Sequence, residues 1–135
     1  QIHVDALPDR YKPLTADDTV VIAHFEKCIE DDDAHIFIAE DEAVPVGYVM
    51  AFFHTIGENP FVFSLPVLHI DQMAVEPAYH GTGVSDQLMD AALEQARTLQ
   101  ADLVTLGVAG FNRRAQNFYK RYGFNVHNMR MSRKP

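Results

Sequence analysis

The stretch Val75-Glu-Pro-Ala-Tyr-His-Gly-Thr-Gly-Val-Ser85 joins a strand pattern to a helix pattern and decides the fold of this chain. Residues 68–75 are rich in apolar side chains and predict a strand, and apolar residues at helical spacing over 84–99 predict a helix. Glycines let a ligand approach the backbone closely. The first N–H groups of a helix lack intrahelical partners and carry the positive end of its dipole. The sequence therefore predicts a site for phosphate oxygens at this turn.

The segments around this turn predict a mixed α/β fold, because helical and strand patterns follow one another along the chain. The expected elements are a helix at about residues 20–29, strands at 35–40, 46–54 and 68–75, a helix at 84–99, a strand at 103–109, a helix at 112–122 and a last strand at 124–131. The short loop at 41–45 predicts an antiparallel hairpin. The strands on either side of the glycine-turn helix need a crossover connection, so they are expected to be parallel.

The composition suits one globular domain, since 135 residues with 47% hydrophobic content can bury a core. The net charge of −8 argues against nucleic acid as a partner and is compatible with a cationic substrate or simply with solubility. No run of 18 apolar residues occurs, so no membrane span is expected. The single cysteine, Cys28, predicts a buried structural thiol in a reducing, cytoplasmic setting. The seven histidines lack metal-ligand spacing, so no metal is expected.

A second segment narrows the ligand of the glycine turn. The turn alone is a weak signal, because Asp86 stands where a dinucleotide-binding motif has its third glycine. Further along the chain lies Asn112-Arg-Arg-Ala-Gln-Asn-Phe-Tyr-Lys-Arg-Tyr-Gly-Phe124. Together the two segments resemble the GCN5-related N-acetyltransferase (GNAT) family over about residues 35–125. The family's Gln/Arg-x-x-Gly-x-Gly/Ala phosphate motif aligns with residues 80–85, and its second signature matches Asn112, Ala115, Tyr119 and Gly123-Phe124.

The resemblance implies a GNAT-like fold, in which a parallel pair of strands splays apart, and acetyl-CoA as co-substrate. Backbone N–H groups of residues 81–86 would hold the pyrophosphate, and the backbone of Met73 and Val75 would pair with the pantetheine arm. Two letters depart from the motif: His80 replaces Gln or Arg, and Ser85 replaces Gly or Ala. The implied cofactor-binding residues are Met73, Ala74, Val75, His80, Gly81, Thr82, Gly83, Val84, Ser85, Asp86, Asn112, Ala115, Phe118 and Tyr119.

The resemblance also implies roles in acyl transfer. Tyr119 matches the family's general acid, which would protonate the leaving thiolate, although a packed aromatic side chain is the alternative. Asp71 is a candidate general base, because strict alternation puts it on one strand face with His69 and Met73. Glu40 and His54 are other candidates, and a water chain would need no base residue. An inward-pointing Asp86 carboxylate would repel the pyrophosphate.

The expected function is transfer of the acetyl group of acetyl-CoA to a primary amine of a small molecule or protein. A non-catalytic CoA-binding module is the alternative, and a nucleotide-binding protein is a weaker one. Residues 1–135 are expected to form one domain that lacks the family's first strand and part of its first helix, of which residues 1–6 would be the remainder. An exposed Phe61-Val-Phe63 segment would suit a homodimer contact, and loop packing explains it equally well.

Overall fold

The computed structural model describes residues 5, 10, 12, 15 and 17–135. The expectation for residues 1–6 therefore lies outside the described residues, apart from Asp5. The elements are α2 (Thr19–Ile29), β1 (Ala34–Asp41), β2 (Val44–Ile56), β3 (Leu65–Val75), the short 3₁₀ helix η1 (Pro77–Tyr79), α3 (Val84–Thr98), β4 (Leu103–Leu106) and α4 (Arg113–Arg121).

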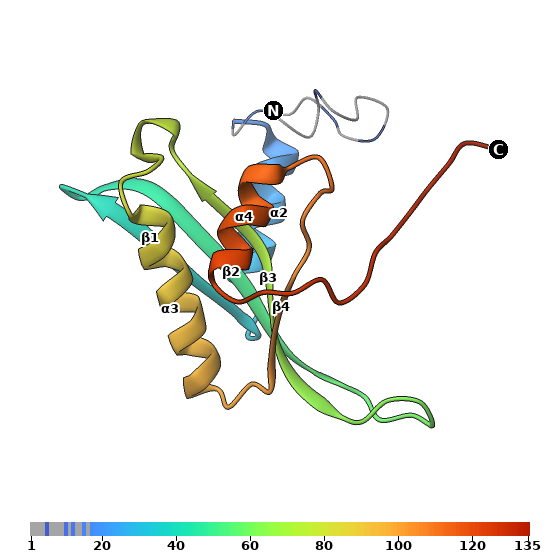
Figure 1. Ribbon diagram of the computed structural model, residues 1–135. Helices are drawn as coiled ribbons and strands as arrows, with labels where there is room; N and C mark the ends of the chain where they lie inside the picture. The colour runs from blue at the N-terminus through green and yellow to red at the C-terminus, as the bar shows by residue number, and fades with distance from the viewer. Residues whose placement is uncertain (1–4, 6–9, 11, 13–14, 16) are drawn as a thin grey trace.

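These strands form one sheet in the order β1-β2-β3-β4 (Figure 1). The β1–β2 and β2–β3 pairs are antiparallel, and β3–β4 is parallel, which confirms the predicted mixed sheet. The first hairpin turns on Glu42 and Ala43, both with positive φ, so it is tighter than the five-residue loop expected. Two central residues with positive φ match the twist of the flanking strands.

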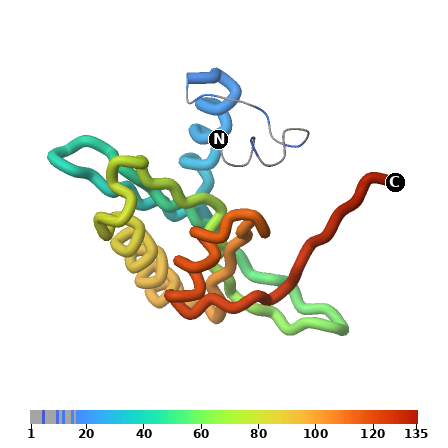
Figure 2. Tube along the Cα trace, turned by 45° about the horizontal axis from the view of Figure 1, so that its top comes forward, coloured from blue at the N-terminus to red at the C-terminus, as the bar shows by residue number. Residues whose placement is uncertain are grey.

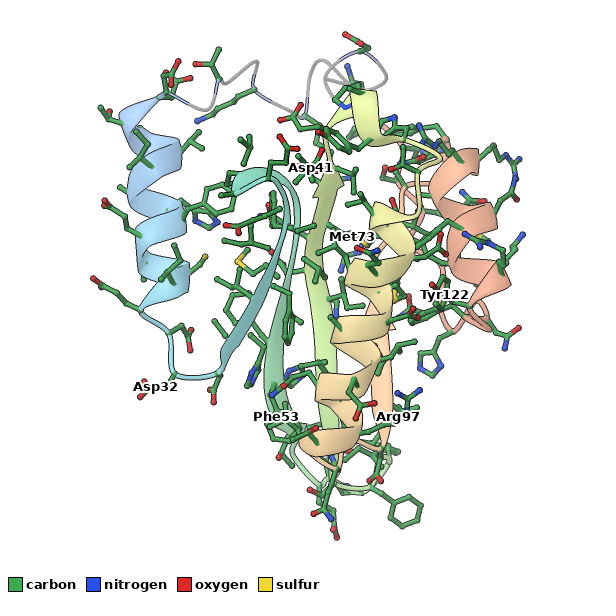
Figure 3. The ribbon with its side chains drawn as sticks, turned by 90° about the vertical axis from the view of Figure 1, so that its left-hand side faces the viewer. Asp32, Asp41, Phe53, Met73, Arg97 and Tyr122 are labelled. Carbon is green, nitrogen blue, oxygen red and sulfur yellow. The ribbon has the colours of Figure 1, made fainter. Side chains whose placement is uncertain are left out.

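Helices cover both faces of the sheet, with α2 on one face and α3 on the other (Figure 3). The apolar stripe of α3 is buried against Val49, Ala51, Leu68 and Ile70. No side chain of α2 is buried, because a groove remains between this helix and the sheet. Cys28 is consequently only half-buried, and the prediction of a buried thiol was wrong. No helix among the described residues is long and apolar enough to cross a membrane.

A bulge in β3 changes which of its side chains face the core. The register steps from Ala51↔Ile70 to Met50↔Gln72, so Asp71 has no partner on β2. The extra residue reverses the alternation, and Met73 joins Ile70 against the core cluster. The expectation that Met73 shares a strand face with His69 and Asp71 was therefore wrong beyond the bulge.

The parallel pair separates before β3 ends. Pairing between β3 and β4 stops at Ile70↔Leu106, although β3 continues to Val75. Residues 107–112 leave the sheet and lead into α4. The backbone of β3 beyond Ile70 thus has no β4 partner, which is the splay that the resemblance implied.

The predicted last strand at 124–131 is wrong, because these residues form no regular structure and run away from the body of the molecule (Figure 2). Val126, Met129 and Met131 are largely exposed. A strand here would have to extend the sheet at β4, whose four residues offer a short edge. Polar residues 125, 127 and 128 interrupt the segment, so little apolar area would be gained by pairing.

Candidate active site

The glycine turn has a backbone that only glycine adopts readily. Gly81 and Gly83 have φ of 77° and 92°, in the left-handed region. The turn is tied to its surroundings by Thr82, whose N–H and hydroxyl both donate to the Tyr79 carbonyl. The Tyr79 phenol in turn donates to Asp41 at 2.7 Å, and this bond raises the pKa of Tyr79. Figure 3 places Asp41 at the same end of the molecule as the turn.

The start of α3 offers uncommitted N–H groups. The first intrahelical bond runs from the Gln87 N–H to the Gly83 carbonyl at 3.0 Å, so the N–H groups of residues 84–86 have no intrahelical partner. Gly83 occupies the capping position and supplies no capping side chain. A Cβ added at Gly81 or Gly83 would meet nothing within 4 Å, so open space lies in front of the turn. This arrangement fits a phosphate group, whose oxygens accept hydrogen bonds.

The carboxylate of Asp86 is engaged by α4. It accepts from the Tyr122 phenol at 3.0 Å and forms an ion pair with Arg121 at 3.0 Å. Desolvation and the Asp86 carboxylate raise the pKa of Tyr122 to about 12. Tyr122 lies on the side of α3 that faces α4 (Figure 3). Because two donors hold this carboxylate, the repulsion expected from an inward-pointing Asp86 is reduced.

His80 connects three elements. Its Nε2 lies 2.9 Å from the carbonyl oxygen of Val75, at the end of β3. Its Nδ1 lies 2.8 Å from a guanidinium nitrogen of Arg114, in the first turn of α4. His80 therefore makes polar contacts through both ring nitrogens at the position where the family motif has Gln or Arg.

The opening between β3 and β4 is bordered by α4. Asn112 caps this helix by accepting from the Ala115 N–H at 3.1 Å. The Gln116 amide donates to the carbonyls of Ala109 and Gly110 and so holds the segment that leaves β4. The start of α4 is thus fixed on one side of the opening. On the other side, Met73–Val75 is paired with β2 and has no partner on its β4 side.

Tyr119 lies on the face of α4 that packs against the core cluster, together with Phe118. The two rings are 5.5 Å apart, and the Phe124 ring lies 6.0 Å from Tyr119 on another side. Burial raises the pKa of Tyr119, so the phenol keeps its proton at neutral pH. This is the protonation state that a proton donor needs.

The sheet face toward α2 carries polar groups near the bulge. Tyr48 donates to Gln72 at 2.8 Å, and burial together with the negative charge of Asp71 raises its pKa. His69 contacts the Thr105 hydroxyl at 2.9 Å across the last rungs of the β3–β4 pair. The other base candidates lie elsewhere on the hairpin, with Glu40 paired to Pro45 and His54 to Val67.

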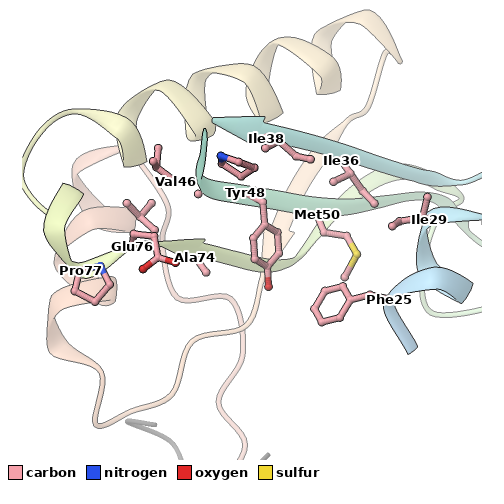
Figure 4. Close-up of a pocket in the computed structure, with 13 residues that line it drawn as sticks. Phe25, Ile29, Ile36, Ile38, Val46, Tyr48, Met50, Ala74, Glu76 and Pro77 are labelled. Carbon is pink, nitrogen blue, oxygen red and sulfur yellow. The ribbon is translucent and has the colours of Figure 1, made fainter. Parts of the chain in front are cut away.

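An apolar groove of about 450 Å³ adjoins these groups, between α2 and the sheet (Figure 4). Phe25 and Ile29 form its α2 wall, and Ile36, Tyr48 and Met50 line the sheet side. Among the described residues, no group of three or more His, Cys, Asp or Glu side chains is arranged to hold a metal ion.

Sequence reasoning missed most contacts that shape this site. The Tyr122–Asp86 bond joins residues 36 positions apart, and the His80–Arg114 contact joins residues 34 positions apart. No local sequence pattern predicts contacts between residues so far apart. The signal that could have pointed to Tyr122 is its position three residues after Tyr119, which places both phenols on one helix face.

Comparison with known proteins agrees with this arrangement. The family model described as "Acetyltransferase (GNAT) family" matches residues 1–124. The chain therefore belongs to the GNAT acetyltransferase family. An uncharacterized N-acetyltransferase of Mycobacterium bovis is 32% identical over 111 residues, which are 82% of this chain and 65% of that protein. The chain spans less than two thirds of the length of the first curated relatives that it matches.

Solved structures share the fold. The BH1408 protein of Bacillus halodurans superposes with a TM-score of 0.91 at 18% identity, over 99% of this chain and 85% of that one. An aminoglycoside N-acetyltransferase, AAC(6')-Iy, in complex with a bisubstrate analogue of CoA and acetylneamine has a TM-score of 0.74 at 21% identity, over 100% and 92% of the two chains. At these identities the likeness concerns the fold alone.

Proposed function

We propose that this chain binds acetyl-CoA and transfers its acetyl group to the primary amine of a small molecule. The observation that carries the proposal is the glycine turn with uncommitted N–H groups beside strand backbone that β4 leaves unpaired. The glycine turn suits a pyrophosphate, and the unpaired strand backbone suits an extended arm that contains amides. CoA carries both groups. Family membership supports the same ligand.

The chain's own groups would bind CoA at two places. The N–H groups of Gly81 and of residues 83–86 would donate to the pyrophosphate, since that of Thr82 is already bonded to Tyr79. The backbone of Met73–Val75 would pair with the pantetheine arm as an added strand. Asn112, Ala115 and Phe118 would border the arm from α4. When bound, acetyl-CoA supplies the activated acetyl thioester.

Tyr119 would donate a proton to the departing thiol sulfur. Its raised pKa keeps the phenol protonated at neutral pH, so it can act as a general acid. The acceptor amine must be neutral to attack. Asp71, exposed at the bulge and with a charge felt by the Tyr48 phenol, would accept its proton directly or through water.

A cationic small-molecule amine is the proposed acceptor. The net charge of −8 attracts cations. The apolar groove beside Tyr48 would hold carbon-rich parts of such an acceptor, while Asp71 would attract the ammonium group. The aminoglycoside N-acetyltransferase AAC(6')-Iy, which shares the fold, has been solved with a bisubstrate analogue that joins CoA to acetylneamine, and this supports a small-molecule acceptor by analogy.

The test measures thiol release from acetyl-CoA with a panel of polyamines, amino sugars and peptides with free N-termini. Acetyl transfer to at least one small amine, identified by mass spectrometry, is the expected result. Tight CoA binding without turnover on any amine would instead make the chain a non-catalytic CoA module. Calorimetry with CoA, ATP and NAD separates both outcomes from nucleotide binding, because the last two ligands lack the pantetheine arm.

A further inference from the structure

His80 is held in one tautomer by its two neighbours. A carbonyl oxygen only accepts hydrogen bonds and a guanidinium only donates them. The 2.9 Å contact to the Val75 carbonyl therefore places the proton on Nε2, and the 2.8 Å contact to Arg114 makes Nδ1 the acceptor. The imidazole is neutral in this arrangement, and both of its nitrogens are used.

The contact fixes where the Arg114 guanidinium lies. Arg114 is exposed on the first turn of α4, and an unrestrained arginine there would sample many rotamers. Arg97 is paired with Glu94 and Arg121 with Asp86, whereas Arg114 contacts an imidazole nitrogen of His80. Its charge is instead held beside the first residue of the glycine turn, with further N–H groups left to donate.

We infer that His80 is a positioning residue that holds the Arg114 guanidinium against the glycine turn, where Arg114 binds the pyrophosphate of CoA. The inference rests on the proposed function. The neutral imidazole accepts one N–H of Arg114, which leaves the other donors of the planar guanidinium available to an anion at the turn. The chain thereby brings a cation to this turn from α4, 34 residues further along.

The position of Arg114 depends on an imidazole nitrogen that accepts a hydrogen bond. The ring of His80 contacts Arg114 on α4 and the Val75 carbonyl on β3. The carboxylate of Asp86, in the first turn of α3, is held by Tyr122 and Arg121.

The experiment titrates CoA, 3'-dephospho-CoA and pantetheine by calorimetry into the intact chain and its variants. Arg114→Gln should weaken CoA and dephospho-CoA equally, by about five- to tenfold, and leave pantetheine unaffected. His80→Ala should give a similar loss, and the double variant no more than the larger single loss, because the two residues act as a unit. Arg97→Gln removes the same charge at the far end of α3 and should bind like the original chain.

The titration with dephospho-CoA locates the contact on the ligand, because this ligand keeps the pyrophosphate and lacks the 3'-phosphate. His80→Gln keeps one donor and one acceptor, so it should retain more affinity than His80→Ala does. Additive losses in the double variant, or an Arg114→Gln penalty confined to CoA, would overturn the inference while leaving CoA binding itself intact. Absence of any CoA binding by the original chain would contradict the proposed function instead.

Discussion

The carboxylate of Asp86, in the first turn of α3, accepts a 3.0 Å hydrogen bond from the phenol of Tyr122 at the end of α4. The bond joins the helix that starts at the glycine turn to the helix that carries Tyr119. The bond also reduces the repulsion between the Asp86 carboxylate and the pyrophosphate that we propose to bind at the turn. The pair therefore connects the two helices and lowers an unfavourable charge interaction.

Replacing Tyr122 with phenylalanine should lower the free energy of unfolding by about 0.5–1 kcal/mol at neutral pH, because one partly exposed hydrogen bond to a charged group is lost. The folded-state pKa of about 12 lies above the ordinary 10, so the bond stabilises the fold fully below about pH 10 and is lost as pH rises through 12. Urea denaturation measures the loss in the free energy of unfolding. Absorbance titration at alkaline pH should find one phenol with a raised pKa in the original chain and not in the variant. Arg121→Gln, which breaks an exposed ion pair, is the control with a smaller expected loss. Equal stability of Tyr122→Phe and the original chain would contradict the role of this bond.

Tyr119→Phe should reduce kcat about 100-fold while CoA affinity stays the same, because only the proton donor is removed. The control variant is Tyr122→Phe, which also loses a phenol oxygen, three residues further along the chain. It should keep kcat. Because the pKa of Tyr119 is raised, the rate should not fall through deprotonation of this acid until the pH exceeds about 10. Stopped assays of thiol release with the best amine provide the rates. A kcat unchanged in Tyr119→Phe would leave the phenol with a packing role only.

Gly83→Ala should disturb both the fold and the cofactor site. Its φ of 92° costs an L-residue about 1–2 kcal/mol, and the new methyl group would occupy the open space in front of the turn. CoA affinity is therefore expected to fall more than stability alone explains. The control is Gly57→Ala, since a Cβ there also meets nothing within 4 Å and its φ is not in the left-handed region. Unfolding curves and CoA titrations of both variants separate strain from blocked binding.

Local sequence patterns predicted the helices and strands that build the site, but not which side chains of β3 face the core. The strand, glycine turn and helix at residues 65–98 could be predicted because their signals are local. The bulge at Asp71 could not, since a one-residue slip depends on pairing with β2, and it moved Met73 to the core face. The expected strand at 124–131 failed for a related reason, because an apolar run becomes a strand only where a partner edge is long enough.

The roles assigned to single residues were predictable only in part. The resemblance pointed to Tyr119, and the structure adds the burial that keeps its phenol protonated. The contacts of Asp86 and His80 could not be predicted, since the identity of a residue does not tell what its side chain contacts. Their partners, Tyr122 and Arg114, come from α4 and depend on how that helix packs.

Gly47→Ala, a substitution in β2, tests whether the neighbouring end of β3 binds the pantetheine arm. A Cβ at Gly47 would lie 3.0 Å from the Ala74 carbonyl oxygen and 3.2 Å from side-chain atoms of Leu88 and Val75. Backbone cannot move aside as a flexible side chain does, so we expect a loss of about 1–3 kcal/mol in the free energy of unfolding. The displaced strand is the one proposed to pair with pantetheine, so affinity for pantetheine itself should fall as well. Gly57→Ala again serves as the control, because its added Cβ meets open space. If Gly47→Ala lost stability yet bound pantetheine as well as the control does, the arm would not lie along the backbone of Met73–Val75.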